Sequence, residues 1–241
     1  MALQLKPERL SLGDYDRQPI SIAGRSFVAD RSGALYWPAE RLLVVADLHL
    51  EKGSSFARRG HLLPPYDTRD TLVRLAEAIE RYEPEIVMSL GDGLHDPGGA
   101  DRMDAGDRDI LRILQDDRRW IWVTGNHDPV IADALGGEVV DCIVRAGLMF
   151  CHEPRPGPVT HEISGHLHPA AKLSHHGAVI RRPCFVGNRL RLVLPAFGAY
   201  TGGLNVLDDA FRPLFGGSGL EVWMLGQEGL YPVAPRQLRD D

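Results

Sequence analysis

The sequence has few cysteines, no long apolar run and no strong excess of one charge. Its three cysteines, Cys142, Cys151 and Cys184, form no CxxC pair and leave an odd thiol in any pairing, which favours a reducing compartment. The longest apolar run, residues 42–46, has strand length and falls far short of the roughly 18 residues that a membrane-spanning helix needs. Residues 1–20 lack the apolar centre of a secretory signal. We therefore expect a cytoplasmic protein that does not enter a membrane.

The composition excludes several further classes. With 44% hydrophobic and 25% charged residues, the chain is close to the globular average, so it is neither collagen-like, mucin-like nor wholly disordered. The net charge of -6 argues against a nonspecific coat on nucleic acid, because such surfaces are basic. A nucleic-acid enzyme is still allowed, since bound metal ions can supply positive charge locally. No break in composition suggests a linker, so we expect a single domain over residues 1–241.

The apolar pattern predicts an α/β fold that begins β-α-β-α-β and continues mostly with strands. Strands are expected over residues 20–23, 26–30, 34–37, 42–46, 85–90, 120–124, 139–144, 148–151, 179–182, 190–194 and 220–225. A loop is expected over residues 47–66. Helices are expected from Asp67 or Thr68 to Pro84, around residues 107–116 and near residues 130–135.

Five short segments carry metal-binding side chains, and each follows an apolar strand or lies in a glycine-bounded loop. They are residues 47–49 (DLH), 91–96 (GDGLHD), 125–128 (GNHD), 151–153 (CHE) and 165–168 (GHLH). One such histidine alone would more often be a structural residue. Five segments together are not explained in that way, because burying unpaired carboxylates and imidazoles is costly. Mixed carboxylate, imidazole and carboxamide donors suit Mn²⁺, Fe or Zn²⁺, so the sequence predicts a metal site.

In this order, on this strand and helix pattern, the five segments resemble the motifs of the calcineurin-like metallophosphoesterase superfamily over residues 44–169. Residues 47–53, 63–67 and 194–203 extend the likeness to the bacterial DNA-ligase-associated metallophosphoesterases, a subgroup known as DNA-damage-response endonucleases. The resemblance implies a four-layer α/β/β/α sandwich with metals at one edge of two packed sheets.

The resemblance also implies a centre of two divalent metal ions, with manganese expected and iron or zinc as alternatives. The first ion would be held by Asp47, His49, Asp92 and His168, and the second by Asp92, Asn126, His152 and His166. Asp92 would bridge the two ions. His127 would face the scissile phosphate and Asp128 would orient or polarise it. His95 matches a histidine of double-strand-break repair nucleases, which favours a phosphodiesterase over a protein phosphatase.

Four basic residues lie near these motifs: Arg58 and Arg59 after the first metal loop, and Arg181 and Arg182 after the last. They would contact flanking phosphates or be solvated surface residues, and the sequence does not decide between these readings. The expected function is phosphodiester hydrolysis on DNA in DNA repair, and the resemblance implies association with an ATP-dependent DNA ligase and a helicase. The alternatives are a small-molecule phosphodiesterase or nucleotide pyrophosphatase, and a non-catalytic scaffold of the same fold.

Overall fold

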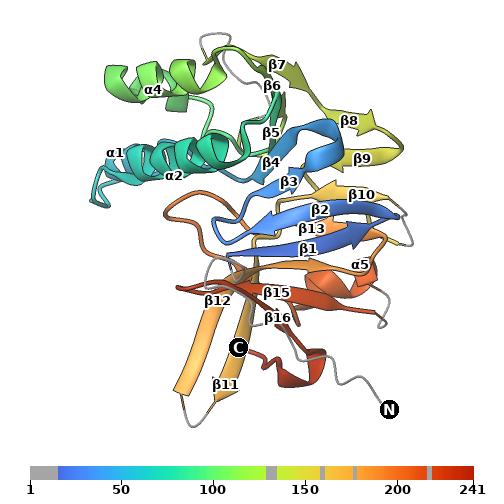
Figure 1. The fold of residues 1–241 in the computed structure, drawn as a ribbon. Helices are drawn as coiled ribbons and strands as arrows, with labels where there is room; N and C mark the ends of the chain where they lie inside the picture. The colour runs from blue at the N-terminus through green and yellow to red at the C-terminus, as the bar shows by residue number, and fades with distance from the viewer. Residues whose placement is uncertain (1–15, 129–134, 158–160, 176–177, 216–218) are drawn as a thin grey trace, which may run out of the picture.

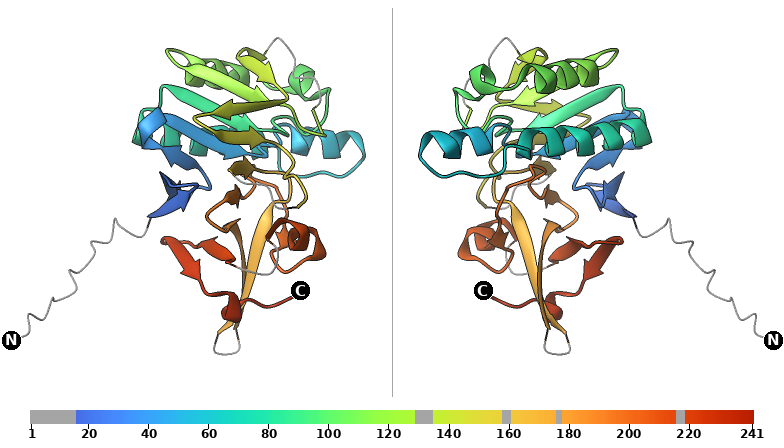
Figure 2. Two further views of the ribbon diagram at one scale, coloured as in Figure 1. Left: turned by 90° about the vertical axis from the view of Figure 1, so that its right-hand side faces the viewer. Right: turned by 90° about the vertical axis from the view of Figure 1, so that its left-hand side faces the viewer.

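Two β-sheets packed face to face form the centre of the protein, and helices cover the outer face of the first sheet (Figure 1, Figure 2). The structure is a computed structural model that describes residues 16–128, 135–157, 161–175, 178–215 and 219–241. Within these ranges, no helix is long and apolar enough to cross a membrane. The predicted α/β fold class is confirmed.

The strands of the first sheet follow one another in chain order. They are β1 (Arg17–Ile22), β2 (Arg25–Asp30), β3 (Leu35–Trp37), β4 (Leu42–Ala46), β5 (Ile86–Leu90), β6 (Arg119–Val123) and β7 (Glu138–Val140). The pairs from β1 to β4 are antiparallel, and those from β4 to β7 are parallel. The carboxyl ends of β4, β5 and β6 therefore meet at one edge, where α/β proteins bind ligands.

Helices pack on the outer face of this sheet, and the two longest, α2 and α4, do so through one apolar side. The helices are α1 (Lys52–Arg58), α2 (Asp67–Tyr82), α3 (Gly99–Arg102) and α4 (Ala105–Gln115). The spacing of Leu72, Leu75 and Ile79 places these side chains on the buried face of α2. Glu83, with a φ of 43°, ends α2 immediately before Pro84.

Strand β4 is buried on both faces, which explains its uninterrupted apolar sequence. Leu42 and Val44 face the second sheet, and Leu43 and Val45 pack under the helices. Strands covered on both sides are apolar throughout, whereas strands with one solvated face alternate. Strand β4 is thus fixed by packing on both faces, and this fixes the start of the loop that follows it.

The second sheet contains the remaining strands. They are β8 (Cys142–Arg145), β9 (Leu148–Cys151), β10 (Glu162–Ser164), β11 (Pro169–His175), β12 (Ala178–Gly187), β13 (Arg191–Val193), β14 (Leu204–Asn205), β15 (Glu221–Leu225) and β16 (Leu230–Val233). The order is β14-β11-β12-β13-β10-β9-β8, and β15 and β16 join it at β12. Strands β11 and β12 form a long hairpin that extends away from the helical layer (Figure 1, Figure 2).

The fourth layer of the sandwich is small. It consists of α5 (Arg212–Phe215) and the preceding 3-10 turn (Asp209–Phe211). Phe211, Leu214 and Phe215 form a buried cluster with strand residues that include Val186 and Val222. The second sheet is therefore covered on its outer face by one short helical segment rather than by a set of long helices.

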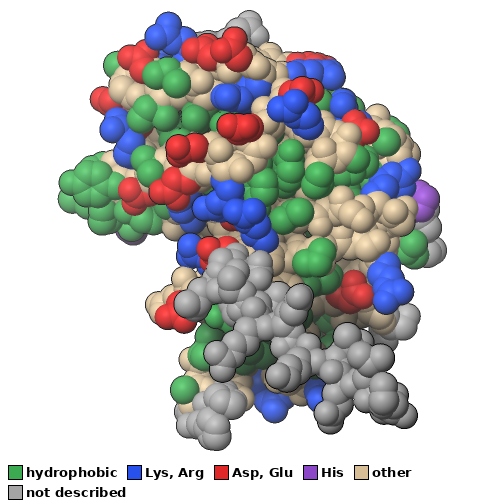
Figure 3. All heavy atoms as spheres, in the orientation of Figure 1, with side chains coloured by type: hydrophobic (Ala, Val, Ile, Leu, Met, Phe, Trp, Pro, Cys, Tyr) green, Lys and Arg blue, Asp and Glu red, His purple; other side chains and the backbone are tan. Residues whose placement is uncertain are grey.

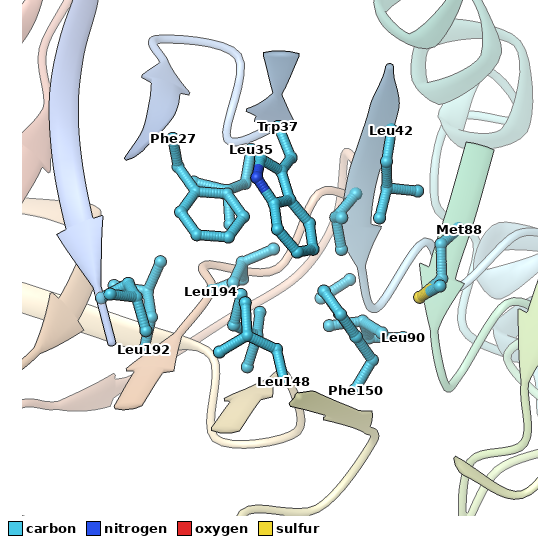
Figure 4. Packing of buried hydrophobic residues seen from close by; sticks show 14 of the residues in the cluster. Phe27, Leu35, Trp37, Leu42, Met88, Leu90, Leu148, Phe150, Leu192 and Leu194 are labelled. Atoms are coloured by element: carbon cyan, nitrogen blue, oxygen red, sulfur yellow. The ribbon is translucent and has the colours of Figure 1, made fainter. Parts of the chain in front are cut away.

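The core between the two sheets is built from aromatic and branched aliphatic side chains (Figure 4). The Trp37 ring centroid lies 4.9 Å from that of Phe27 in the first sheet and 6.3 Å from that of Phe150 in the second. Leu148 and Leu192 of the second sheet complete this part of the core. The same apolar cluster therefore joins both sheets.

Two predictions about secondary structure are wrong in detail. The strand expected over residues 139–144 divides at Asp141, where the chain leaves β7 in the first sheet and enters β8 in the second. The loop expected over residues 47–66 contains α1, in which Gly53 and Ser54 are poor helix formers. Most of the helix expected near residues 130–135 lies outside the described residues. The single domain over residues 1–241 stays a prediction.

A buried ion pair joins two strands of the second sheet close to the loop that carries His166 and His168. Glu162 of β10 and Arg191 of β13 are directly paired residues of a parallel ladder. Arg191 Nη2 lies 3.1 Å from Glu162 Oε1, and both side chains are almost completely buried. The same guanidinium donates to the carbonyl oxygen of Arg155 at 2.8 Å. Breaking such a pair leaves a buried charge without a partner.

Replacing Arg191 by methionine is expected to lower the free energy of unfolding by about 3–5 kcal/mol, because Glu162 then remains buried and unpaired. Adding Glu162→Gln should restore part of that loss, since the double variant buries no unpaired charge. Urea unfolding of both variants at neutral pH measures the difference. A double variant no more stable than Arg191→Met would mean that lost packing, not charge, causes the effect.

Candidate metal centre

The side chains that the sequence predicts as metal ligands lie together at one edge of the two sheets. They come from the loops after β4, β5, β6, β9 and β10 and are Asp47, His49, Asp92, Asn126, His152, His166 and His168. Strands β4 to β6 are parallel neighbours, and so are β9 and β10. In each sheet the parallel ladder brings the strand ends side by side, so residues far apart in sequence converge.

The first group of donor atoms belongs to Asp47, His49, Asp92 and His168, and these atoms lie within 4.8 Å of one another. His49 Nε2 is 3.2 Å from His168 Nε2 and 3.7 Å from Asp92 Oδ2. His168 Nε2 is 3.5 Å from Asp47 Oδ1. Asp47, His49 and Asp92 are buried, and His168 is half-buried. These are the residues predicted for the first ion.

The second group surrounds Nε2 of His152. This nitrogen lies 2.9 Å from Asn126 Oδ1, 3.0 Å from His166 Nδ1 and 3.5 Å from Asp92 Oδ1. Asp92 therefore presents Oδ2 to the first group and Oδ1 to the second. The predicted bridging of two metal ions by Asp92 stays a prediction.

Both groups fit a divalent metal ion. Ligand atoms about 2.0–2.2 Å from one ion lie roughly 3–4 Å from each other, which is the spacing found here. In each group two imidazole nitrogens face each other, His49 with His168 and His166 with His152, and such a contact needs a proton or a cation between them. The mixture of carboxylate, imidazole and carboxamide donors suits Mn²⁺, Fe or Zn²⁺.

Burial favours the neutral form of His49 and His166, which is the form that binds metals. Burial, and then the charge of His168, lower the pKa of His49 to about 2. Burial and the neighbouring His152 lower the pKa of His166. For His168, burial acts to lower the pKa, but the hydrogen bond and charge of Asp47 outweigh it and raise the pKa. A cation bound in the first group would replace that proton beside Asp47.

The loops that carry the ligands have backbone conformations that L residues rarely adopt. The φ angle is 53° at Asp47, 44° at His49, 44° at Asp92, 70° at His166 and 45° at His168. A left-handed conformation costs a residue with a side chain roughly 1–2 kcal/mol. Strain of this kind persists only where the surrounding structure holds it, and it gathers at functional sites.

Two glycines allow these loops to approach one another. A Cβ atom at Gly91, where φ is 72°, would lie 2.1 Å from Nδ1 of His152. A Cβ atom at Gly125 would lie 2.2 Å from Oδ1 of Asp92. Any larger residue at either position would displace a predicted ligand.

His127 lies at the solvent-exposed rim of the centre. Its Nδ1 is 3.0 Å from the carbonyl oxygen of His95, and its ring stacks on the His95 ring at a centroid distance of 5.2 Å. The backbone N–H of His127 donates to Oδ1 of Asp92 at 2.9 Å. Burial, and then the charge of Lys52, lower the pKa of His95 to about 4, so His95 is a neutral neighbour of His127.

Asp128 is completely buried and binds backbone groups. Its Oδ2 accepts from the N–H of Leu94 at 2.9 Å, and its Oδ1 accepts from the N–H of Gly125 at 3.2 Å. Burial raises its pKa to about 6. In the part of the chain that the structure describes, no hydrogen bond joins its carboxylate to the His127 ring. Asp128 thus connects the loops after β5 and β6, and its predicted action on His127 stays a prediction.

Of the first pair of predicted substrate-binding arginines, one lines a cleft beside the centre. Arg58 and Arg59 are both exposed, at the end of α1. Arg59 borders the cleft together with His127. Sequence analysis did not identify Phe56, which lines the same cleft, because residues 47–66 were expected to form a loop. The only signal was a single aromatic residue among charged and small ones.

The second pair lies beyond His168. Arg181 and Arg182 border a smaller pocket that His168 also lines. Arg181 Nε lies 3.2 Å from Oδ1 of Asp241, so part of its charge is already neutralised. Arg59 and Arg182 therefore flank the centre on two sides, and Arg181 is held by the end of the chain. The contact of all four arginines with substrate stays a prediction.

Comparison with known proteins agrees with this geometry. The family model described as calcineurin-like phosphoesterase matches residues 40–166. The crystal structure of the Pseudomonas putida nuclease MPE is similar to 90% of this chain and all of that chain, at 29% identity and a TM-score of 0.71.

Two other solved structures are less similar. A protein of unknown function from Aquifex aeolicus is 18% identical over 53% of this chain and 78% of its own, with a TM-score of 0.37. The Escherichia coli phosphoesterase YfcE is 14% identical over 81% of this chain and 94% of its own, with a TM-score of 0.39. Neither bears on the site. Comparison with curated proteins gives no match.

Replacing Gly91 by alanine is expected to empty the second group, because the new Cβ would overlap the His152 ring. Gly24→Ala is a matched control: its φ is 75°, similar to that of Gly91, but no atom lies within 4 Å of the new Cβ. Both variants carry the backbone cost of roughly 1–2 kcal/mol. After reloading with Mn²⁺, elemental analysis should find less metal in Gly91→Ala than in Gly24→Ala. Equal metal content would contradict this role of Gly91.

Proposed function

Because the chain belongs to the calcineurin-like phosphoesterase family and is thus a metal-dependent phosphoester hydrolase, we propose that it cleaves phosphodiester bonds in DNA. The observation that carries this proposal is the pair of adjacent ligand groups that share Asp92. Two neighbouring metal sites suit in-line displacement at phosphorus. The likeness to a nuclease over 90% of the chain supports a nucleic-acid substrate.

The residues of the two groups would hold two divalent ions, and manganese is the metal that we propose. When bound, such ions supply positive charge to the phosphate and activate water as the nucleophile. Asp92, with one oxygen toward each group, would fix their spacing. The carboxylate of Asp47 is held in position without a metal, since its Oδ2 accepts a hydrogen bond from the backbone N–H of His166 at 2.9 Å.

We propose that His127 acts on the leaving group. The carbonyl oxygen of His95 can only accept, so the 3.0 Å contact assigns a proton to Nδ1 of His127. Nε2 is then the nitrogen that can face the substrate. In the imidazolium form, Nε2 would give its proton to the departing alkoxide, and the His95 carbonyl would stabilise the cation.

The cations that would bind flanking phosphates are local. On the face shown in Figure 3, Lys and Arg are interspersed with Asp and Glu and form no continuous basic surface. Arg59 and Arg182 border the centre on two sides. We therefore expect the protein to contact only those DNA phosphates that lie next to the reacting one.

We further propose that the protein acts in DNA repair in the cytoplasm, in association with an ATP-dependent DNA ligase and a helicase. The support is the resemblance of three segments to the ligase-associated subgroup. Two of these segments, residues 63–67 and 194–203, lie side by side, since Oη of Tyr200 donates to the carbonyl oxygen of Pro64 at 3.0 Å. Residues 63–66 are exposed and Tyr200 is half-buried beside them, so a partner could contact the two segments at this point. Co-purification of the tagged chain with the ligase tests this association.

The metal-stripped protein, reloaded with Mn²⁺, is expected to cleave DNA and a model diester faster than a phosphomonoester. The reason is charge: two divalent ions exceed the charge of Asp47 and Asp92 only modestly, which matches a phosphate carrying one negative charge. Parallel reactions with Mg²⁺, Fe²⁺ and Zn²⁺ identify the preferred metal. Faster turnover of the monoester would contradict a phosphodiesterase. If the protein cleaved the model diester but not DNA, a small-molecule phosphodiesterase would be favoured. If it cleaved no substrate with any metal, a non-catalytic scaffold would be favoured.

Replacing His127 by alanine should leave both metals in place and lower the rate of DNA cleavage by ~10²–10⁴. The loss should be smaller for a nitrophenyl diester, because nitrophenolate departs without a proton. Kinetics on both substrates and elemental analysis measure this. His161 directly precedes β10, at the end opposite the loop that carries His166, so His161→Asn serves as the control histidine variant and should retain the wild-type rate. An equal loss on both substrates would show that His127 does not protonate the leaving group.

A further inference from the structure

A cleft of about 470 Å³ opens beside the metal centre. It is lined by Lys52, Phe56, Arg59, His95, Asp96, Pro97, Asn126 and His127. Its volume lies within the ~300–1,000 Å³ of typical small-ligand sites. Asn126 and His127 form the wall that it shares with the centre. One substrate molecule could therefore occupy this cleft and place its phosphate at the candidate metal centre.

The cleft has a surplus of positive charge. Lys52 and Arg59 line it, and neither lies within ion-pair distance of a carboxylate among the described residues, although the charge of Asp67, outside the lining, acts on Lys52. Asp96 is the one acidic residue in the lining, and Arg102 binds its two oxygens at 2.9 and 2.7 Å. Burial acts to raise the pKa of Asp96, but the hydrogen bonds from Arg102 and Ser55 hold it at about 2. The charge of Asp96 is thus already compensated. Lys52 and Arg59 leave the lining with a net positive charge, which favours binding of a phosphate.

The cleft also has an aromatic wall. The half-buried ring of Phe56 lies 5.8 Å from the His95 ring, which stacks on the His127 ring at 5.2 Å. Lys52 Nζ lies 6.0 Å from the Phe56 centroid. Aromatic rings beside cations are how proteins bind unpaired nucleotides, through stacking on the base and attraction of the backbone phosphate. A diester without a base would leave Phe56 uncovered.

We propose that this cleft is a nucleotide subsite, in which Phe56 stacks on the base next to the reacting phosphate and Lys52 and Arg59 bind the following phosphate. The inference rests on the proposed function and narrows the substrate to a polynucleotide. It assigns to α1 a binding role separate from that of the metal ligands. Phe56 recognises the presence of a base and the two cations recognise the continuation of the strand.

Binding of deoxyadenosine monophosphate tests this subsite without relying on turnover. The Mn²⁺-loaded protein is titrated in a calorimeter with the 5′ and the 3′ isomer, so that either strand polarity is covered, and with 2-deoxyribose 5-phosphate. The wild-type protein should bind one nucleotide isomer at least about fivefold more tightly than the sugar phosphate, the contribution of one stacked base. Phe56→Leu should reduce this ratio to near one, and Phe56→Tyr should preserve it.

Tyr231→Leu is the matched control, since Tyr231 is an exposed aromatic residue on β16, outside the cleft. It should keep the wild-type ratio. Equal binding of nucleotide and sugar phosphate by the wild-type protein, or an unchanged ratio in Phe56→Leu with its metals retained, would overturn the subsite. DNA cleavage is assayed in parallel. A wild-type protein that binds nucleotide through Phe56 without cutting DNA would contradict the proposed function alone.

Discussion

A hydrogen bond between the two sheets holds one predicted ligand of the candidate metal centre in position. Nδ1 of His152, which follows β9, lies 3.2 Å from the carbonyl oxygen of Leu90 at the end of β5. Because a carbonyl only accepts, the proton lies on Nδ1, and Nε2 is left unprotonated to face Asp92 and Asn126. This contact requires the backbone at Gly91 to lie against the His152 ring. It also requires the apolar core between the sheets, to which Leu90 of β5 and Phe150 of β9 both belong.

Much of the fold and most of the candidate centre could be predicted, because both depend on patterns within short segments of the sequence. The resemblance to the calcineurin-like superfamily is confirmed by the family match and by the similar nuclease structure. Strands such as residues 42–46 are short apolar runs that end in polar residues, so their ends were recognisable. Parallel pairing then places those ends together. The predicted ligands therefore converge within each sheet, the packing of the two sheets brings the two sets together, and their metals and roles stay predictions.

Other features depend on contacts between distant segments that no local pattern reports. Helix α1 has no apolar periodicity, so the sequence did not predict it. The position of Phe56 beside His95 and His127 depends on how α1 packs against the loop after β5, which no local pattern reports. The pairing of Glu162 with Arg191 depends on the register of β10 and β13. The division at Asp141 is marked in the sequence only by that one charged residue, and residues 139–144 otherwise have the apolar pattern of a single strand although its two halves belong to different sheets.

The left-handed conformation of the ligand loops restricts which amino acids evolution can use there. Asp, Asn and His are the residues other than glycine that tolerate positive φ best. Five of the predicted ligands have such angles, and all five are Asp or His. Glutamate also adopts positive φ in this chain, at Glu51 (66°) and Glu83 (43°), but it does so less readily than Asp or His. The ligand positions thus combine two requirements, a side chain that can bind a metal and a backbone that tolerates positive φ, and Asp and His meet both at the lowest conformational cost.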